Sequence, residues 1–246
     1  MVQPVVDSPV ATAETDDERL LIAADYHAGL EVRLRTEGVE LASAAGERRE
    51  RLVRLVDRER PDRVVLLGDV GDAIGTPGDE ERAELRALFD ALTDRAPVVV
   101  AKGNHDGGLA AVADAYDAVT LSEGAGICVG DIGFAHGHTW PNPAVLSSET
   151  VCVAHEHPQV RLTDEVGGAR TERVWLRGRL APGPFREHNG MEPEADCVVF
   201  PAFNDRVGGT WVNEADDFLA PFLPEGLANG EAYLLDGTRL GAYERV

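Results

Sequence analysis

The chain has 246 residues, and 44 Asp and Glu against 23 Lys and Arg give it a formal net charge of −21. Hydrophobic residues make up 43% and charged residues 27%, which is usual for a globular protein and excludes collagen-like, disordered and disulfide-scaffold classes. No apolar run approaches the ~18 residues of a transmembrane helix, and the three cysteines are widely spaced. We therefore expect a cytoplasmic protein without a membrane partner and with free thiols.

The acidic excess argues against a protein that coats DNA with a basic face. Lys102 is the only lysine, and the other basic residues are arginine. At molar ionic strength the Debye length falls to ~3 Å, so surface carboxylates barely repel one another. The composition resembles that of proteins from halophilic archaea, and we interpret the charge as adaptation to salt.

The N-terminal residues 1–18 are polar and acidic, and we predict a disordered tail there, followed by a single domain over residues 19–246. Along the chain, short runs of consecutive apolar residues alternate with segments in which apolar residues recur at helical spacing. This alternation favours a parallel sheet with helices on its faces. The predicted strands are 20–24, 64–67 and 98–100, and the predicted helices are 47–59 and 80–92.

After about residue 118 the pattern changes to short apolar runs between glycine-rich turns. Few helical stripes occur in this half, which indicates a second, more antiparallel sheet packed on the first. The runs are 127–129, 132–135, 151–154, 197–200 and 233–235.

Polar clusters follow five of these apolar runs directly. Ligands of open α/β sheets bind where the carboxyl ends of strands meet, so we expect the five clusters to converge. Imidazole and carboxylate together suit Mn, Fe, Zn or Ni rather than calcium, and a metal pair needs a bridging carboxylate. The clusters are Asp25-Tyr26-His27, Gly68-Asp69-Val70-Gly71-Asp72, Gly103-Asn104-His105-Asp106, His136-Gly137-His138 and His155-Glu156-His157.

The order D-x-H, G-D, G-N-H-D, H and H-x-H resembles the calcineurin-like metallophosphoesterase superfamily. This resemblance implies an α/β fold of four layers, in which two mixed β-sheets pack face to face between flanking helices. A closer likeness is to archaeal phosphoesterases described as SbcD-related. That likeness rests on residues 29–31, 37–39, 154–158, 201–204 and 208–209.

The resemblance also implies a role for each matching residue. Two divalent metal ions are expected, with manganese as the first choice and iron, zinc, nickel or cobalt as alternatives. Asp69 would bridge the ions, and a hydroxide bridging them would attack phosphorus. His105 would protonate the leaving group, and Asp106 would orient His105. Asp25, His27 and His157 would complete the first metal site, and Asn104, His136 and His155 would complete the second.

Weaker substrate-binding candidates are Arg33, Arg35, His138, Arg173 and Arg177. Arginine binds phosphate through a planar fork, which favours a substrate-contacting role for Arg173 and Arg177. The competing interpretation is that these arginines pair with the many carboxylates of the chain. Asp72 either orients a metal ligand or caps the next turn.

We interpret the chain as a two-metal-dependent phosphoester hydrolase acting on phosphodiester bonds, with DNA or RNA as one candidate substrate. The alternatives are a small-molecule phosphomonoesterase and a weakly catalytic, metal-stabilised scaffold. His105 and Asp106 argue against the scaffold, because a scaffold needs no acid for a leaving group. The resemblance also allows a homodimer.

Overall fold

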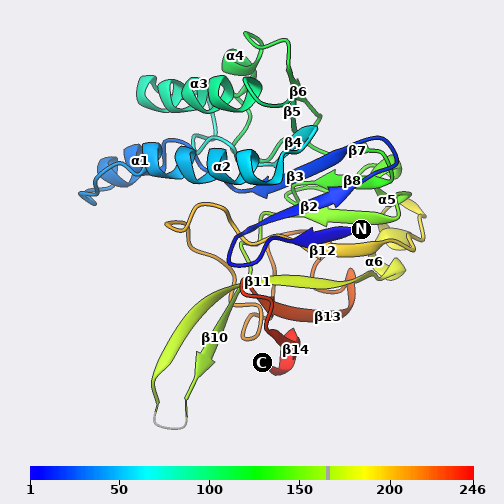
Figure 1. The fold of residues 1–246 in the computed structure, drawn as a ribbon. Helices are drawn as coiled ribbons and strands as arrows, with labels where there is room; N and C mark the ends of the chain where they lie inside the picture. Colours follow the sequence, from blue (N-terminus) through cyan, green and yellow to red (C-terminus); the bar gives the residue numbers. More distant parts are fainter. Residues whose placement is uncertain (165–166) are drawn as a thin grey trace.

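Two mixed β-sheets lie face to face at the centre of the protein (Figure 1). The computed structural model describes residues 1–164 and 167–246. Buried residues of both sheets form one core between them, with Ile22 and Val65 from the first sheet and Phe134, Trp175 and Val198 from the second. This architecture confirms the fold class expected from the sequence.

The first sheet has six strands in the order β1-β2-β3-β4-β5-β6. Strands β3 to β6 are parallel, and the pairs β1–β2 and β2–β3 are antiparallel. The strands are β1 (Val2–Pro4), β2 (Val10–Glu14), β3 (Arg19–Ala24), β4 (Arg63–Leu67), β5 (Val98–Val100) and β6 (Val119–Leu121). The helices of this half are α1 (Leu30–Thr36), α2 (Ala45–Glu59), α3 (Asp79–Thr93) and α4 (Ala110–Ala113).

Helices α2 and α3 cover the outer face of the first sheet (Figure 1). Leu52 of α2 and Leu88 of α3 are fully buried there against Leu21 and Leu66 of the sheet. The apolar residues recur at helical spacing, which places them on one side of each helix and leaves charged residues toward solvent.

The second sheet contains eight strands, in the order β14-β13-β11-β12-β9-β8-β7, with β10 paired to β11. Pairs β8–β9 and β9–β12 are parallel, and the other pairs are antiparallel. The strands are β7 (Ile127–Val129), β8 (Ile132–Ala135), β9 (Thr150–Val153), β10 (Gln159–Thr163), β11 (Ala169–Leu180), β12 (Asp196–Val199), β13 (Leu227–Leu234) and β14 (Arg239–Ala242). Its outer face packs against α5 (Pro143–Leu146), α6 (Pro182–Asn189), the 3-10 turn Tyr243–Arg245 and intervening loops.

The prediction of a disordered tail over residues 1–18 is wrong. Strands β1 and β2 add two antiparallel strands to the edge of β3, and Val10 pairs with Ala23. Val2, Val10, Ala11 and Ala13 are all at most 2% exposed. The acidic residues that suggested disorder lie mainly in turns, while small and β-branched residues form the strands between them.

Loops at one edge of the two sheets are joined by backbone hydrogen bonds. The N–H of Asp25 donates to the carbonyl of Gly68, and the N–H of His27 donates to the carbonyl of Asp69. In the second sheet, the N–H of Ala154 donates to the carbonyl of His136. The polar clusters predicted from the sequence therefore meet at this edge. Among the residues that the structure describes, no helix is both long and apolar enough to cross a membrane.

Val10 provides a test of the N-terminal strands. We expect Val10→Ala to lower the free energy of unfolding by about 2 kcal/mol, because it removes buried methyl groups and leaves a cavity. Val6→Ala is the control, since Val6 is 63% exposed and should change stability little. Chemical denaturation measures both variants, and equal effects would contradict the packing of β2.

Candidate metal centre

An uncommon backbone conformation occurs at most of the predicted metal ligands. Among the described residues, eight non-glycine residues have a positive φ, and five of these are predicted ligands. Such a conformation costs of order 1 kcal/mol or more for a residue with a side chain, and it accumulates at functional sites. It turns the chain sharply at the strand ends and directs the side chains together. The five are Asp25 (φ 54°), His27 (49°), Asp69 (46°), His155 (71°) and His157 (45°).

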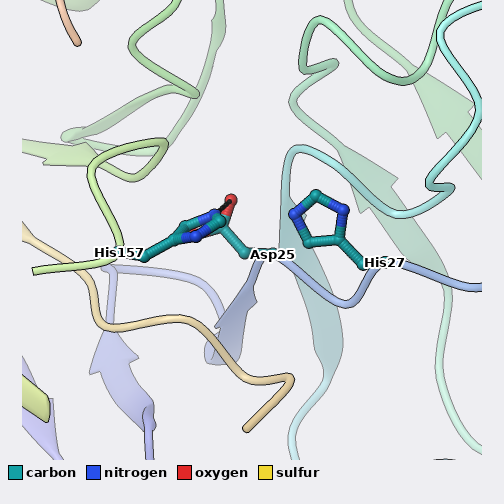
Figure 2. Close-up of side chains that lie close together, drawn as sticks. All are labelled: Asp25, His27 and His157. Carbon is teal, nitrogen blue, oxygen red and sulfur yellow. Dashed lines mark ion pairs between the residues drawn. The ribbon is translucent and has the colours of Figure 1, made fainter. Parts of the chain in front are cut away.

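The first ligand group consists of Asp25, His27 and His157, whose candidate ligand atoms lie within 4.8 Å of one another. The Nε2 of His157 lies 3.2 Å from the Oδ1 of Asp25. Figure 2 shows the His157 ring against the Asp25 carboxylate, with the His27 ring beside them. The loop after β3 supplies two of these residues, and the loop after β9 supplies the third.

The second ligand group consists of Asp69, His136 and His155, which meet the same distance criterion. The Oδ2 of Asp69 lies 3.3 Å from the Nε2 of His136 and 3.8 Å from the Nε2 of His27. One carboxylate oxygen therefore lies between the two groups. This position suits the bridging carboxylate that a metal pair needs.

Most of the predicted ligand residues have a buried side-chain atom without a hydrogen-bond partner. Leaving buried polar atoms without a hydrogen bond costs about 1–3 kcal/mol each, so such a cluster is unusual unless a ligand satisfies it. Mixed imidazole, carboxylate and amide donors suit a transition-metal ion, and the residues present fit the two-ion site of the expected fold. The buried atoms without a hydrogen-bond partner include Asp25 Oδ1 and Oδ2, His27 Nε2, Asn104 Oδ1, His136 Nε2 and His157 Nε2.

A second layer of hydrogen bonds sets the orientation of three ligand rings. The Nδ1 of His136 donates to the carbonyl of Leu67 at 3.2 Å, and the Nδ1 of His157 donates to the carbonyl of Gly208 at 2.8 Å. The Nδ1 of His27 donates to the Oδ1 of Asp72 at 3.1 Å. Each ring is thereby left with Nε2 directed at the centre, as such outer partners do in metal sites. Asp72 orients a ligand, which was one of its two predicted roles.

His105 lies at the edge of the centre. Its backbone N–H donates to the Oδ1 of Asp69 at 2.9 Å, and its Nε2 is 3.9 Å from the Oδ2 of the same carboxylate. Its ring Nδ1 donates to the backbone carbonyl of Asp72. The prediction that Asp106 orients this ring is wrong, because the Asp72 carbonyl already holds it.

Asp106 instead joins two loops. It is fully buried, and its carboxylate accepts hydrogen bonds from the backbone N–H groups of Val70 (2.9 Å), Gly71 (3.1 Å) and Gly103 (2.8 Å). These three N–H groups lie in tight turns, and a buried N–H group needs a hydrogen-bond acceptor, which the Asp106 carboxylate provides. Asp106 therefore fixes the position of the loops that hold Asp69 and Asn104.

The candidate substrate-binding residues divide by their surroundings. Arg33 donates from Nε to the Oδ2 of Asp72 at 2.7 Å. It therefore helps to position Asp72, the carboxylate that accepts from His27. Arg35 is paired with Glu80 on α3. His138 is half-buried, and its ring centroid lies 5.5 Å from that of His136.

Arg173 and Arg177 lie at different places along β11. Arg173 donates to the carbonyl of Ala202, in the loop next to Asp25. Arg177 donates to the carbonyl of Val2 at 3.2 Å, so the structure does not bring it to the metal centre. Four residues of a strand span ~13 Å, which separates the two arginines although they are close in sequence.

Sequence analysis missed the supporting role of the loop after β12. The N–H of Asn204 donates to the carbonyl of Asp25, and its Nδ2 donates to the carbonyl of Tyr26. A side chain on Gly209 would place its Cβ 2.0 Å from the carbonyl oxygen of His157. The Ala-Phe-Asn and Gly-Gly segments were the available signal, but their partners are far away in the sequence.

The electrostatics of the centre follow from burial and close opposite charges. Burial alone would raise the pKa of Asp69, but His136 and His27 hold it far below its usual range. Burial would lower the pKa of His136, yet the carboxylates of Asp69 and Asp25 raise it to about 9. Burial and the neighbouring His136 lower the pKa of His155 to about 4.

The model of the family described as calcineurin-like phosphoesterase matches residues 18–200. The chain belongs to this family. It is therefore a metal-dependent phosphoester hydrolase, and the ligand groups described above are candidates to hold the divalent ions that such enzymes use. A search of curated proteins finds no match.

A solved structure shares the fold of this calcineurin-like phosphoesterase. The nuclease MPE of Pseudomonas putida aligns with a TM-score of 0.58 and 17% identity, over 98% of this chain and 100% of that one. The phosphoesterase YfcE of E. coli aligns with a TM-score of 0.36 and 16% identity, over 59% of this chain and 73% of that one. At this identity the first alignment supports the fold alone, and the second carries no argument.

Metal binding should release a proton. At pH 7.5 a ring with a pKa of about 9, such as His136, is protonated in the metal-free enzyme, whereas only a neutral ring can coordinate a metal. We expect titration calorimetry in buffers of different ionisation enthalpy to show about one proton released, and affinity to fall as the pH drops below about 9. Repeating the titration at pH 10 is the control, because His136 is already mostly neutral there and the release should fall by about one proton. A heat that does not depend on the buffer at pH 7.5 would contradict the charged state of His136.

Proposed function

We propose that this enzyme is a two-metal phosphodiesterase that hydrolyses DNA or RNA. The observation that carries the proposal is the position of Asp69, whose Oδ2 lies within 3.8 Å of a ring nitrogen from each ligand group. His105 stands at the same carboxylate, with its Nε2 3.9 Å from the Oδ2 of Asp69. Nucleic acid is proposed as the substrate class by analogy with the nuclease MPE, whose fold aligns over 98% of the chain.

The residues would hold the two ions as follows. Asp25, His27 and His157 would bind the first ion, Asn104, His136 and His155 would bind the second, and Asp69 would bind both. When bound, such a pair polarises phosphoryl oxygens and lowers the pKa of water toward ~7. Asp69 is suited to bridging because its depressed pKa keeps the carboxylate ionised at neutral pH.

His105 would hold the proton for the leaving group. A backbone carbonyl can only accept, so the bond to the Asp72 carbonyl keeps a hydrogen on Nδ1 and fixes the ring. The other ring nitrogen, Nε2, carries a hydrogen only in the cationic form of the ring, and in that form it would donate to the leaving oxygen of the ester. Asp72 orients two histidines, because its carboxylate accepts from His27 and its backbone carbonyl accepts from His105.

Finer features of the proposal rest on the sequence. We propose manganese as the physiological metal, a cytoplasmic location, a homodimer as the functional form, and kinship with SbcD-related phosphoesterases of a halophilic archaeon. The mixed nitrogen and oxygen donors are compatible with manganese and equally with iron, zinc, nickel or cobalt. The proposed halophilic origin is supported by the excess of acidic residues, 44 against 23 basic ones.

A His105→Ala variant tests the proposed acid. We expect kcat for bis-p-nitrophenyl phosphate and for labelled oligonucleotides to fall by roughly 10²–10⁴-fold, because the leaving group loses its proton donor. The metal content, measured by atomic emission on dialysed protein, should stay at two ions per chain.

His188→Ala is the control, because His188 is exposed and stacks on Trp140. Loss of both metals from His105→Ala would contradict the assigned role. Wild-type cleavage of p-nitrophenyl phosphate alone, with no diester cleaved, would overturn the diesterase proposal in favour of a small-molecule phosphatase.

Salt should stabilise the fold. Because the net charge is −21, we expect the free energy of unfolding to rise between 0.1 and 2 M KCl as screening weakens carboxylate repulsion. Urea denaturation measures this, with sucrose at equal osmolality as the uncharged control. An equal rise in sucrose and in KCl would argue against adaptation to salt.

A further inference from the structure

The loop after β12 forms the rim of the centre on the side of the first ligand group. At one end the N–H of Asn204 donates to the carbonyl of Asp25 at 3.1 Å. At the other end the carbonyl of Gly208 accepts from the Nδ1 of His157 at 2.8 Å. A substrate that extends beyond its scissile phosphate on this side would pass over this loop.

Two arginines from distant parts of the chain converge on this loop. Arg173 of β11 donates from Nη1 to the carbonyl of Ala202 at 3.0 Å. Arg51 of α2 donates from Nη2 to the carbonyl of the next residue, Phe203, and its guanidinium lies 4.2 Å from the Phe203 ring centroid. Figure 1 shows the loop, in yellow-orange, between α2 and β11. The charge of Arg173 acts on Arg51, so the two guanidinium groups lie near each other.

These arginines are paired less fully with carboxylates than a chain with 44 acidic residues would allow. No carboxylate of the described residues lies within 4.0 Å of Arg173, which is half-buried. Arg51 has one such partner, Asp205 at 3.5 Å, and its Nε is buried without a hydrogen-bond partner. Holding partly buried cations together without full pairing costs free energy, which a bound anion would offset.

Further arginines surround Arg51, and each is paired with a glutamate: Arg48 and Arg206 with Glu31, and Arg54 with Glu50. Arg51 lines a hollow whose wall contains four arginines and two acidic residues. Burial, together with the charges of Arg173 and Arg48, lowers the pKa of Arg51, and burial lowers the pKa of Arg173. Asp205 raises the pKa of both arginines and Glu172 raises that of Arg173, but burial outweighs these carboxylates.

We propose that Arg51 and Arg173 bind the phosphate next to the scissile one in a polynucleotide strand. The planar forks of two guanidiniums match phosphate oxygens, and adjacent carbonyls of the loop hold them in place. The proposal rests on the proposed function and specifies its substrate as a chain with at least two phosphates. Asp205 competes with that phosphate, and its exposed carboxylate (61%) is free to turn away.

Binding of an oligonucleotide tests the subsite. The probe is fluorescein-labelled decathymidylate, and every protein is manganese-loaded and carries His105→Ala so that cleavage is slow. We expect Arg173→Gln to weaken binding roughly tenfold. The slope of log affinity against log salt should become shallower by about 0.7, the value for one lost phosphate contact on a single strand. Asp205→Asn should tighten binding, because it removes the competing carboxylate.

Arg58→Gln is the matched control for charge. Arg58 lies on the same helix as Arg51, seven residues or ~10 Å further along, and pairs with Glu59. Arg51→Gln is also informative, but it removes the contact with the Phe203 ring, so Arg51→Lys accompanies it to keep the charge. Equal weakening by Arg58→Gln and Arg173→Gln, or an unchanged salt slope in Arg173→Gln, would overturn the proposal.

Kinetics separate this proposal from the proposed function. In the wild type, a trinucleotide with two phosphates should have a higher kcat/KM than a dinucleotide with one, and Arg173→Gln should bring the ratio close to one. Cleavage with an unaltered ratio would refute the subsite and leave the diesterase intact. A third outcome is that the wild type cleaves neither substrate while the salt slope is shallower in Arg173→Gln but not in Arg58→Gln. That result would refute the diesterase and leave the subsite as a nucleic-acid contact.

Discussion

The buried carboxylate of Asp69 is the interaction on which the centre depends. Its Oδ2 lies between ring nitrogens of His27 and His136, and its Oδ1 accepts the backbone N–H of His105. Both ligand groups and the proposed acid are therefore positioned relative to a single side chain. A close approach of the next loop is required as well, because a Cβ at Gly103 would lie 2.2 Å from the Asp69 Oδ1.

The fold stabilises a site that is locally unfavourable. Asp25, His27 and Asp69 adopt positive φ values, and several ligand atoms are buried without hydrogen bonds. The two sheets offset these costs through the large apolar core between them and through backbone hydrogen bonds that join the ligand loops. Asp106 and Asn204 contribute by satisfying or linking the turns rather than by touching the metal positions.

Charge is distributed unevenly in this acidic protein. Most arginines near the surface are paired with carboxylates, as Arg35 is with Glu80. Arg173 departs from this pattern at the rim of the centre, where a repulsive neighbour, Arg51, also lies. A protein with a net charge of −21 repels a polyanion over most of its surface. The proposed role of the two arginines is to attract a nucleic-acid strand locally, next to the metal ligands.

The sequence by itself determined the family, the two-sheet fold and the residues that form the two ligand groups, because each motif directly follows an apolar run and the ends of parallel strands meet at one edge. Only the tertiary structure decided what depends on partners far away in the chain. Residues 1–18 are ordered because β3 offers them an edge, and Asp106 binds backbone donors rather than His105. Arg173 reaches the loop next to Asp25 while Arg177 does not, because their positions along β11 separate them, and spacing in the sequence does not reveal this.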